Sequence, residues 1–181
     1  MALALWPVFD LFEFAERIEF EDNVLAIFNH VLGAEKHLAH RHFRFLPHFH
    51  KIYQKQNGFG ELTRTVTLML TKGRDHLLGD EEGRKDLGEL ADFIKSCYGV
   101  VKKEESLTYV LTFLQYLYLE YGSALAADHP LRERVLEEYF EKKGELGDES
   151  KAAIINFLLI WHYVYGEGEG AVNELMKGEL E

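Results

Sequence analysis

Cysteine, proline and glutamine are all scarce in this chain of 181 residues. There is one cysteine, Cys97, and there are three prolines and three glutamines. A single thiol excludes an internal disulfide and every paired-cysteine metal or redox motif, and the apolar helical pattern around Cys97 predicts a packing role. Three glutamines against 31 acidic residues is a composition typical of thermophilic proteins.

Long apolar runs and targeting signals are also missing. The longest apolar run, AAIINFLLIW, is far shorter than the roughly 20 residues that a helix needs to span a bilayer. The opening stretch MALALWPVF has no basic region before its apolar residues and soon reaches Asp10, which does not fit a secretory signal. We therefore expect a cytoplasmic protein without membrane contact.

Recognisable catalytic and metal-binding motifs are absent from the sequence. The nine histidines form no HxxxH, HExxH or ExxH pattern. Two pairs have helical spacing, His37 with His40 and His76 with Asp80, but neither has an obvious third ligand, so no metal or cofactor is predicted. The four serines lie outside any GxSxG pattern. The two glutamates of GEGEG at 166–170 would repel phosphates, so this stretch is predicted to be a flexible hinge.

Helical periodicity dominates the chain and predicts one all-α domain over residues 1–181, an irregular bundle of seven to nine helices. Asp22, Asp80, Ser106, Asp128 and Asp148 are expected N-caps. The threonine-rich segment 63–71 has strand propensity but no evident partner strand, so it is assigned to a helix. The predicted helices are 7–20, 23–46, 47–56, 61–77, 81–98, 106–127, 130–143 and 149–165, with a short tail helix from about 170.

Charge is strongly segregated along the chain. Residues 36–74 hold eight basic residues and one acid, a net charge of +7, whereas the remaining residues hold 12 basic and 30 acidic residues, a net charge of −18; together they give −11. Five histidines and three phenylalanines lie in HLAHRHFRFLPHFHK, residues 37–51. Such segregation is informative about binding partners rather than about the fold.

A helix over 23–46 would present a cationic ridge opposite its apolar face. Arginines there can bind phosphates or carboxylates bidentately, and Phe43 and Phe49 could stack on bases if exposed. The predicted nucleic-acid-binding residues are Lys36, His37, His40, Arg41, Arg44, His48, Lys51, Lys55, Arg64, Lys72 and Arg74.

Three interpretations of this ridge stay open. The first is an accessory subunit that binds single-stranded RNA or DNA, or a nucleic-acid-bearing assembly, without catalysis. The second is an adaptor that docks an acidic partner protein. In the third, the ridge pairs internally with acidic stretches such as 80–89 or 133–145. Within the same predicted helix, Glu35 and His42 project into the apolar face, where buried polar groups need partners.

The arrangements Arg44-x5-His50 and Arg41-x6-His48 resemble the arginine-then-histidine pattern of HEPN-type helical ribonucleases. That resemblance implies a metal-independent endoribonuclease in which Arg41 or Arg44 holds the scissile phosphate and His48 or His50 transfers a proton, with the pairs of two protomers brought together in a dimer. Pro47 interrupts the pattern here, and the segment lies early in the chain, whereas the family usually carries it late.

Two C-terminal segments, 106–127 and 149–165, are apolar around most of their circumference. We expect them to be the central helices of the bundle; the alternative is a homo-oligomeric interface. Taken together, the sequence predicts a small cytoplasmic all-α protein that is not an enzyme and binds nucleic acid through residues 36–74.

Overall fold

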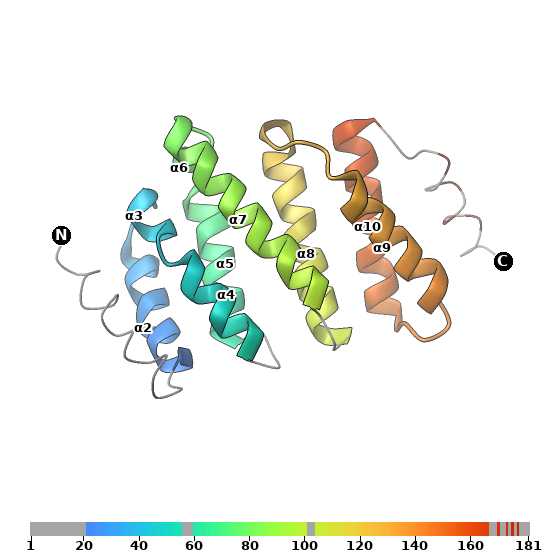
Figure 1. The fold of residues 1–181 in the computed structure, drawn as a ribbon, viewed down its shortest axis with the longest axis horizontal. Helices are drawn as coiled ribbons and strands as arrows, with labels where there is room; N and C mark the ends of the chain where they lie inside the picture. Colours follow the sequence, from blue (N-terminus) through green and yellow to red (C-terminus); the bar gives the residue numbers. More distant parts are fainter. Residues whose placement is uncertain are drawn as a thin grey trace. The chain divides into compact units, whose positions relative to one another are not determined.

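The computed structural model describes residues 21–55, 60–100 and 104–166, together with positions 170, 173, 175 and 177. All regular structure in these residues is helical, which confirms the predicted all-α class (Figure 1). The helices are α2 (Glu21–Ala34), α3 (His40–Phe43), α4 (Leu46–Lys55), α5 (Gly60–Lys72), α6 (Arg74–Leu77), α7 (Glu81–Val100), α8 (Glu104–Tyr121), α9 (His129–Lys142) and α10 (Asp148–Tyr165), with a 3-10 turn over Gly122–Ala124.

Several helix boundaries differ from those predicted. The segment 63–71 is helical within α5, as expected, but the predicted helices 23–46 and 61–77 are each divided. Asp80 and Asp128 act as N-terminal caps, accepting hydrogen bonds from the backbone N–H groups of Gly83 and Leu131. Asp22, Ser106 and Asp148 were wrong as caps, because all three lie inside their helices. The predicted helix 7–20 lies outside the described residues.

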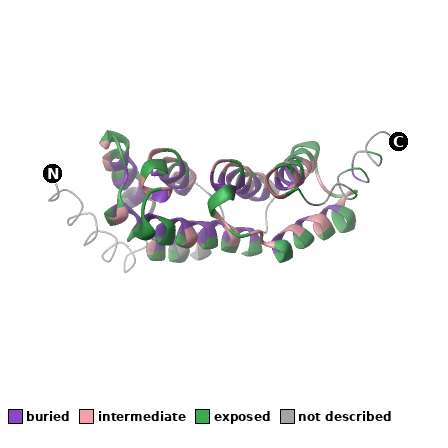
Figure 2. Cartoon of the chain, turned by 90° about the horizontal axis from the view of Figure 1, so that it is seen from above, coloured by how far each residue is buried: buried purple, intermediate pink, exposed green. Residues whose placement is uncertain are grey.

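The chain forms two compact units, of which the first ends at Phe93 and the second begins at Ile94, inside α7. In each unit the buried sides of the helices face one another and the exposed residues lie outside (Figure 2). Among the described residues, no helix is long and apolar enough to cross a membrane.

In the first unit, α2 packs along α5, and aromatic side chains fill the space against α4 and α7. The Phe28 ring lies 4.6 Å from Phe45 and 5.7 Å from Phe49, and Phe49 lies 6.3 Å from Phe93 (ring centroids). These rings are buried, and such pairs contribute about 0.5–1.5 kcal/mol beyond their buried area. Phe45 and Phe49 of the basic segment, residues 36–74, therefore belong to the core of this unit.

A small polar network fixes the alignment of α2 against α5. The buried Asn29 amide donates to the Glu61 carbonyl at 2.8 Å and to its carboxylate at 2.9 Å. The Thr65 hydroxyl donates to the Asn29 side-chain oxygen at 2.7 Å. Because each partner is satisfied only in this register, sliding one helix along the other would leave buried polar groups unpaired.

In the second unit, α8 and α10 pack along each other around a cluster of large aromatic side chains. Trp161 lies 5.1 Å from Tyr118 and 6.0 Å from Phe157, and all three are fully buried. These helices form the core of their unit, as the sequence predicted. Both also leave apolar side chains exposed, Leu119 on α8 and Tyr163 on α10, the latter 79% exposed.

The predicted hinge at 166–170 begins where α10 ends. Gly166 closes the helix in a left-handed conformation, with φ of 67°, and donates its N–H to the His162 carbonyl at 2.8 Å. Glycine adopts this conformation without steric cost, which explains its position after the last turn. Residues 167–169 lie outside the described residues.

Candidate nucleic-acid interface

Helix α2 ends at Ala34, whereas the sequence predicted an unbroken helix to residue 46. The end is held by a lysine from a distant part of the chain. The Lys72 ammonium, at the end of α5, donates to the backbone carbonyls of Leu32, Gly33 and Glu35 at 3.1, 2.6 and 2.7 Å. The last carbonyls of a helix have no partner within it, and a cation there also interacts favourably with the helix dipole. The Leu38 N–H then donates to the Lys72 carbonyl at 3.2 Å, which fixes the bend.

The expectation of one straight cationic ridge is therefore wrong. Instead, the bend after α2 is held against the junction of α5 and α6, and basic residues come from both segments. The His37 imidazole lies 3.3 Å from the Asp75 carboxylate across this junction. We call the exposed lysine, arginine and histidine side chains of residues 36–74 the basic surface; they are Lys36, His37, Arg41, Arg44, Lys51, Arg64 and Arg74.

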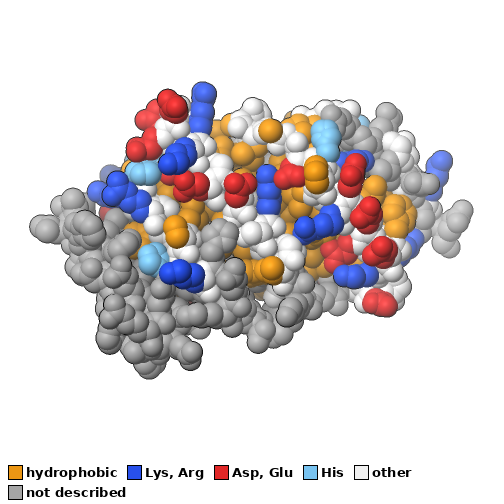
Figure 3. Space-filling view, viewed as in Figure 1, with side chains coloured by type: hydrophobic (Ala, Val, Ile, Leu, Met, Phe, Trp, Pro, Cys, Tyr) orange, Lys and Arg blue, Asp and Glu red, His pale blue; other side chains and the backbone are white. Residues whose placement is uncertain are grey.

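The basic surface is not uniformly positive. Arg41 lies 3.5 Å from Glu35, and basic side chains alternate with acidic ones on the face in Figure 3. His37, Asp75 and Arg41 are exposed, whereas Glu35 is half-buried; pairs that involve exposed groups contribute little to stability and can exchange partners. Within the described part of the chain, the side chains of Lys36, Arg44 and Arg64 form no hydrogen bond or ion pair.

Phe43 and Phe49 cannot provide the stacking surface considered from the sequence, because both are buried. Phe43 packs against the His76 ring at 5.5 Å, and Phe49 belongs to the aromatic core around Phe28. Neither ring can therefore stack on a base.

Two predicted site residues have other roles in the structure. Lys72 caps the end of α2, and His40 is half-buried beside the carboxylate of Asp86. His48 is also half-buried, with its ring 6.5 Å from Phe45. The side chains of His50 and Lys55 lie outside the described residues.

His40, His76 and Asp86 meet at one end of the first unit, where α3, α6 and the start of α7 come together (Figure 1). The Asp86 carboxylate is 2% exposed; its Oδ2 lies 2.9 Å from His40 Nδ1 and 2.6 Å from His76 Nε2. His40 Nε2 lies 3.6 Å from Glu82. Part of the basic segment thus pairs internally with the acidic stretch 80–89, one of the three alternatives left open.

His42 is fully buried, as its place on the apolar face predicted, whereas Glu35 is only half-buried and pairs with Arg41. His42 Nδ1 lies 2.8 Å from the Ala39 backbone nitrogen and 3.0 Å from the Ala39 carbonyl oxygen, and the tautomer of the ring decides whether it accepts from the first or donates to the second. Among the described residues, His42 Nε2 has no hydrogen-bond partner. Burial lowers the pKa of His42, and donation from Nδ1 to the Ala39 carbonyl offsets this only in part.

Acid is expected to destabilise the first unit through His42. Because its pKa is lowered in the folded state, below pH about 6.5 the unfolded chain takes up a proton that the folded chain does not. The free energy of unfolding should then fall as the pH falls, by up to about 1.4 kcal/mol per pH unit, until the folded pKa is reached. Urea unfolding at several pH values between 7.5 and 5 measures this.

His42→Asn is the matched control, because its side-chain oxygen can accept the Ala39 N–H without titrating. The remaining histidines are common to both proteins, so the difference between their pH profiles isolates His42. Parallel profiles would show that His42 does not stay neutral on folding.

The ribonuclease alternative requires arginine and histidine side chains to act together. Arg41 lies in α3, Arg44 lies in the turn that follows, and His48 lies in the first turn of α4. Arg41 is already paired with Glu35. This alternative stays a prediction, which an RNA cleavage assay can test.

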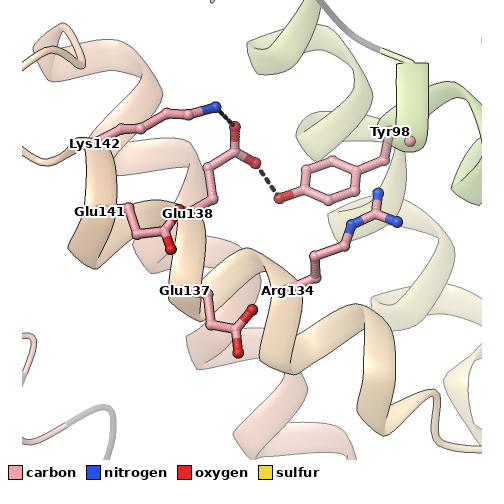
Figure 4. A pocket seen from close by; sticks show the side chains of 7 residues that line it. Tyr98, Arg134, Glu137, Glu138, Glu141 and Lys142 are labelled. Carbon is pink, nitrogen blue, oxygen red and sulfur yellow. Dashed lines mark hydrogen bonds and ion pairs between the residues drawn. The ribbon is translucent and has the colours of Figure 1, made fainter.

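In the second unit, a shallow pocket between α7 and α9 is lined by Tyr98, Gly99, Arg134, Glu137, Glu138, Glu141 and Lys142 (Figure 4). The Tyr98 hydroxyl donates to Glu138, and Lys142 lies 2.9 Å from the other oxygen of that carboxylate. The Arg134 guanidinium lies 4.7 Å above the Tyr98 ring. Burial, and then the bond to Glu138, raise the pKa of Tyr98, so the phenol stays neutral. These groups satisfy one another and tie α9 to the end of α7.

Comparison with family models, with curated proteins and with solved structures finds no significant match. Sequence reasoning missed the grouping of His76 and Asp86 with His40 because its members are far apart in the chain. One feature of the sequence could have indicated it. Asp86 lies next to Leu87, on the apolar side of the segment that forms α7, and the structure shows that Asp86 is buried there.

Proposed function

We propose that this protein binds nucleic acid without catalysis, through phosphate contacts made by the basic surface. One observation carries the proposal: Lys72 holds the bend after α2 against the α5–α6 junction, with Lys36, Arg41 and Arg74 exposed around it. Phosphate contacts need exposed cations rather than a particular fold.

The chemistry of the surface favours single strands over a sequence-specific duplex site. The aromatic rings that would stack on bases are buried, which leaves charge and hydrogen bonding as the means of binding. Arg44 and Lys36 are exposed with no side-chain partner among the described residues, so binding breaks no existing interaction there. A flexible single strand can follow cations that do not lie in one straight line.

Changing both Arg41 and Arg44 to alanine is expected to weaken binding of labelled single-stranded RNA or DNA. The log–log dependence of affinity on salt should flatten by about 0.7 for each phosphate that is no longer bound, and the double variant should bind on the order of tenfold more weakly at about 0.1 M salt. Filter binding over a salt series measures both quantities. Stability should change little, because both side chains are exposed.

Arg84→Ala combined with Lys85→Ala is the charge-matched control. Both residues are exposed on α7 in the same unit, outside the basic segment. Equal weakening in the two double variants would show that net charge alone governs binding. No binding at about 50 mM salt between pH 6 and 8, to single strands or duplex, would refute the proposal.

The same incubation distinguishes a binder from a ribonuclease. We expect labelled single-stranded RNA to stay intact with the wild-type protein. Specific cleavage that disappears in His48→Ala and in Arg41→Ala, but persists in the Arg84 and Lys85 control, would establish the enzyme instead, since loss of a general acid or base costs about 100-fold or more.

A further inference from the structure

We propose that His40, His76 and Asp86 form a binding site for one divalent transition metal ion, with zinc as the expected ion. The three residues come from α3, α6 and α7, and each offers one ligand atom within 4.8 Å of the others. Two imidazoles and a carboxylate are a ligand set that zinc accepts. This inference is independent of nucleic-acid binding.

The distances fit an ion after a small adjustment. Tetrahedral zinc has bonds of about 2.0–2.2 Å to nitrogen and oxygen, which separates its ligand atoms by roughly 3.3–3.5 Å. His40 Nδ1 and His76 Nε2 now lie 2.9 and 2.6 Å from the same oxygen, Asp86 Oδ2. Both ring nitrogens point at the Asp86 carboxylate, and His40 Nδ1 lies 3.0 Å from its Oδ1 as well, so a modest outward shift of the carboxylate opens the place that the ion would occupy.

Proton positions are compatible with binding. As hydrogen-bond donors to Asp86, the two imidazoles carry a proton on the nitrogen that would bind the metal. Moving that proton to the other ring nitrogen frees the ligand atom without a change in charge. In His40 the other nitrogen is Nε2, which lies 3.6 Å from Glu82, and a carboxylate beside the second nitrogen is the usual companion of a metal-bound histidine.

The three ligand side chains differ in how far they are exposed to solvent. The Asp86 side chain is 2% exposed, that of His76 is 13% exposed and that of His40 is 28% exposed. An ion can therefore enter past His40. It would then be held by the buried Asp86 carboxylate, whose negative charge is otherwise stabilised by hydrogen bonds to the two imidazoles. Three protein ligands leave the fourth tetrahedral position for water, on the exposed side.

The surrounding backbone brings these ligands together by close packing. A Cβ atom on Gly83 would lie 1.8 Å from the His76 carbonyl oxygen, so only glycine permits this approach of α7 to α6. The helices α3 and α6 have four residues each, and α6 has no side-chain cap. Such short helices gain little from their own hydrogen bonds, and a shared ion would fasten both of them to α7.

Titration of the chelator-treated full-length protein with zinc tests the proposal. We expect one ion per chain by calorimetry, and an absorption band of tetrahedral Co²⁺ when cobalt is used instead. His40→Gln, His76→Gln and Asp86→Asn should each weaken zinc binding by at least about 100-fold, since even neighbours of ligands contribute 10–100-fold. Circular dichroism establishes that each variant is folded; His40→Gln, at the most exposed ligand, is the variant least disturbing to packing.

His37→Gln is the matched control, because His37 lies three residues from His40 and its side chain is 71% exposed. It should bind zinc as the wild type does. Zinc should also raise the thermal midpoint of the wild type and of His37→Gln, and not that of Asp86→Asn. Equal affinity in all variants, no saturable binding below about 0.1 mM zinc, or unchanged binding in Asp86→Asn would each overturn the assignment.

Discussion

Replacing Trp161 by alanine is expected to lower the free energy of unfolding by about 3–5 kcal/mol. The ring is fully buried on α10, 4.8 Å from Tyr165 and 5.1 Å from Tyr118, with Phe157 on the same helix 6.0 Å away. Truncation removes this packing and leaves a cavity that backbone-anchored neighbours cannot fill. Urea unfolding followed by far-ultraviolet circular dichroism, which reports helix content, measures the change.

Trp161→Phe separates packing from hydrogen bonding. The indole N–H of Trp161 has no hydrogen-bond partner among the described residues, so phenylalanine removes an unsatisfied donor while it keeps an aromatic ring. We expect it to cost much less than alanine. Similar values for the two variants, or a destabilisation below about 1 kcal/mol for alanine, would show that the ring is not packed as it is in the structure.

The helical class and the two core helices of the second unit could be predicted because they depend on local signals. Asp128 precedes Pro130 and an apolar period, and it caps α9 as such a pattern predicts. The apolar circumference of 149–165 places Ile154, Phe157 and Trp161 in the core. These features follow from the order of residues within one or two turns.

The basic segment was harder to interpret because its helix break depends on a residue 37 positions away. Nothing between Gly33 and Leu38 marks a helix end as strongly as proline would, and the pattern of α2 continues plausibly into residues 39–45. The bend exists because the Lys72 ammonium reaches the carbonyl of Glu35. Tertiary contacts of this kind override local propensity.

The abundance of phenylalanine among the histidines and arginines has a structural explanation. Phe45 and Phe49 pack on Phe28, so the apolar half of the segment builds the core of the first unit. The charged residues, which alternate with these rings along the chain, then lie on the opposite side and stay exposed. From the sequence alone, the basic and the aromatic residues could have formed one binding surface. In the structure the aromatic rings are buried, so only the basic residues remain at the surface.

Lys72→Met is expected to lower the free energy of unfolding by about 2 kcal/mol. Methionine retains the apolar stem of the side chain but removes the ammonium that caps three carbonyls at the end of α2, and hydrogen bonds to a charged group contribute about 1.5–3 kcal/mol. The destabilisation stays near the lower end because these carbonyls are only partly buried and water can replace some of the bonds. Urea unfolding measures it.

Arg64→Met on the same helix is the control, since its side chain is exposed and has no partner among the described residues; it should change stability by less than about 0.5 kcal/mol. Nucleic-acid binding provides the second measurement. Because the Lys72 ammonium faces backbone carbonyls rather than solvent, Lys72→Met should leave the salt dependence of binding unchanged wherever the protein is folded. Unchanged stability together with a flattened salt dependence would instead make Lys72 a phosphate ligand, and the bend after α2 would then need another cause.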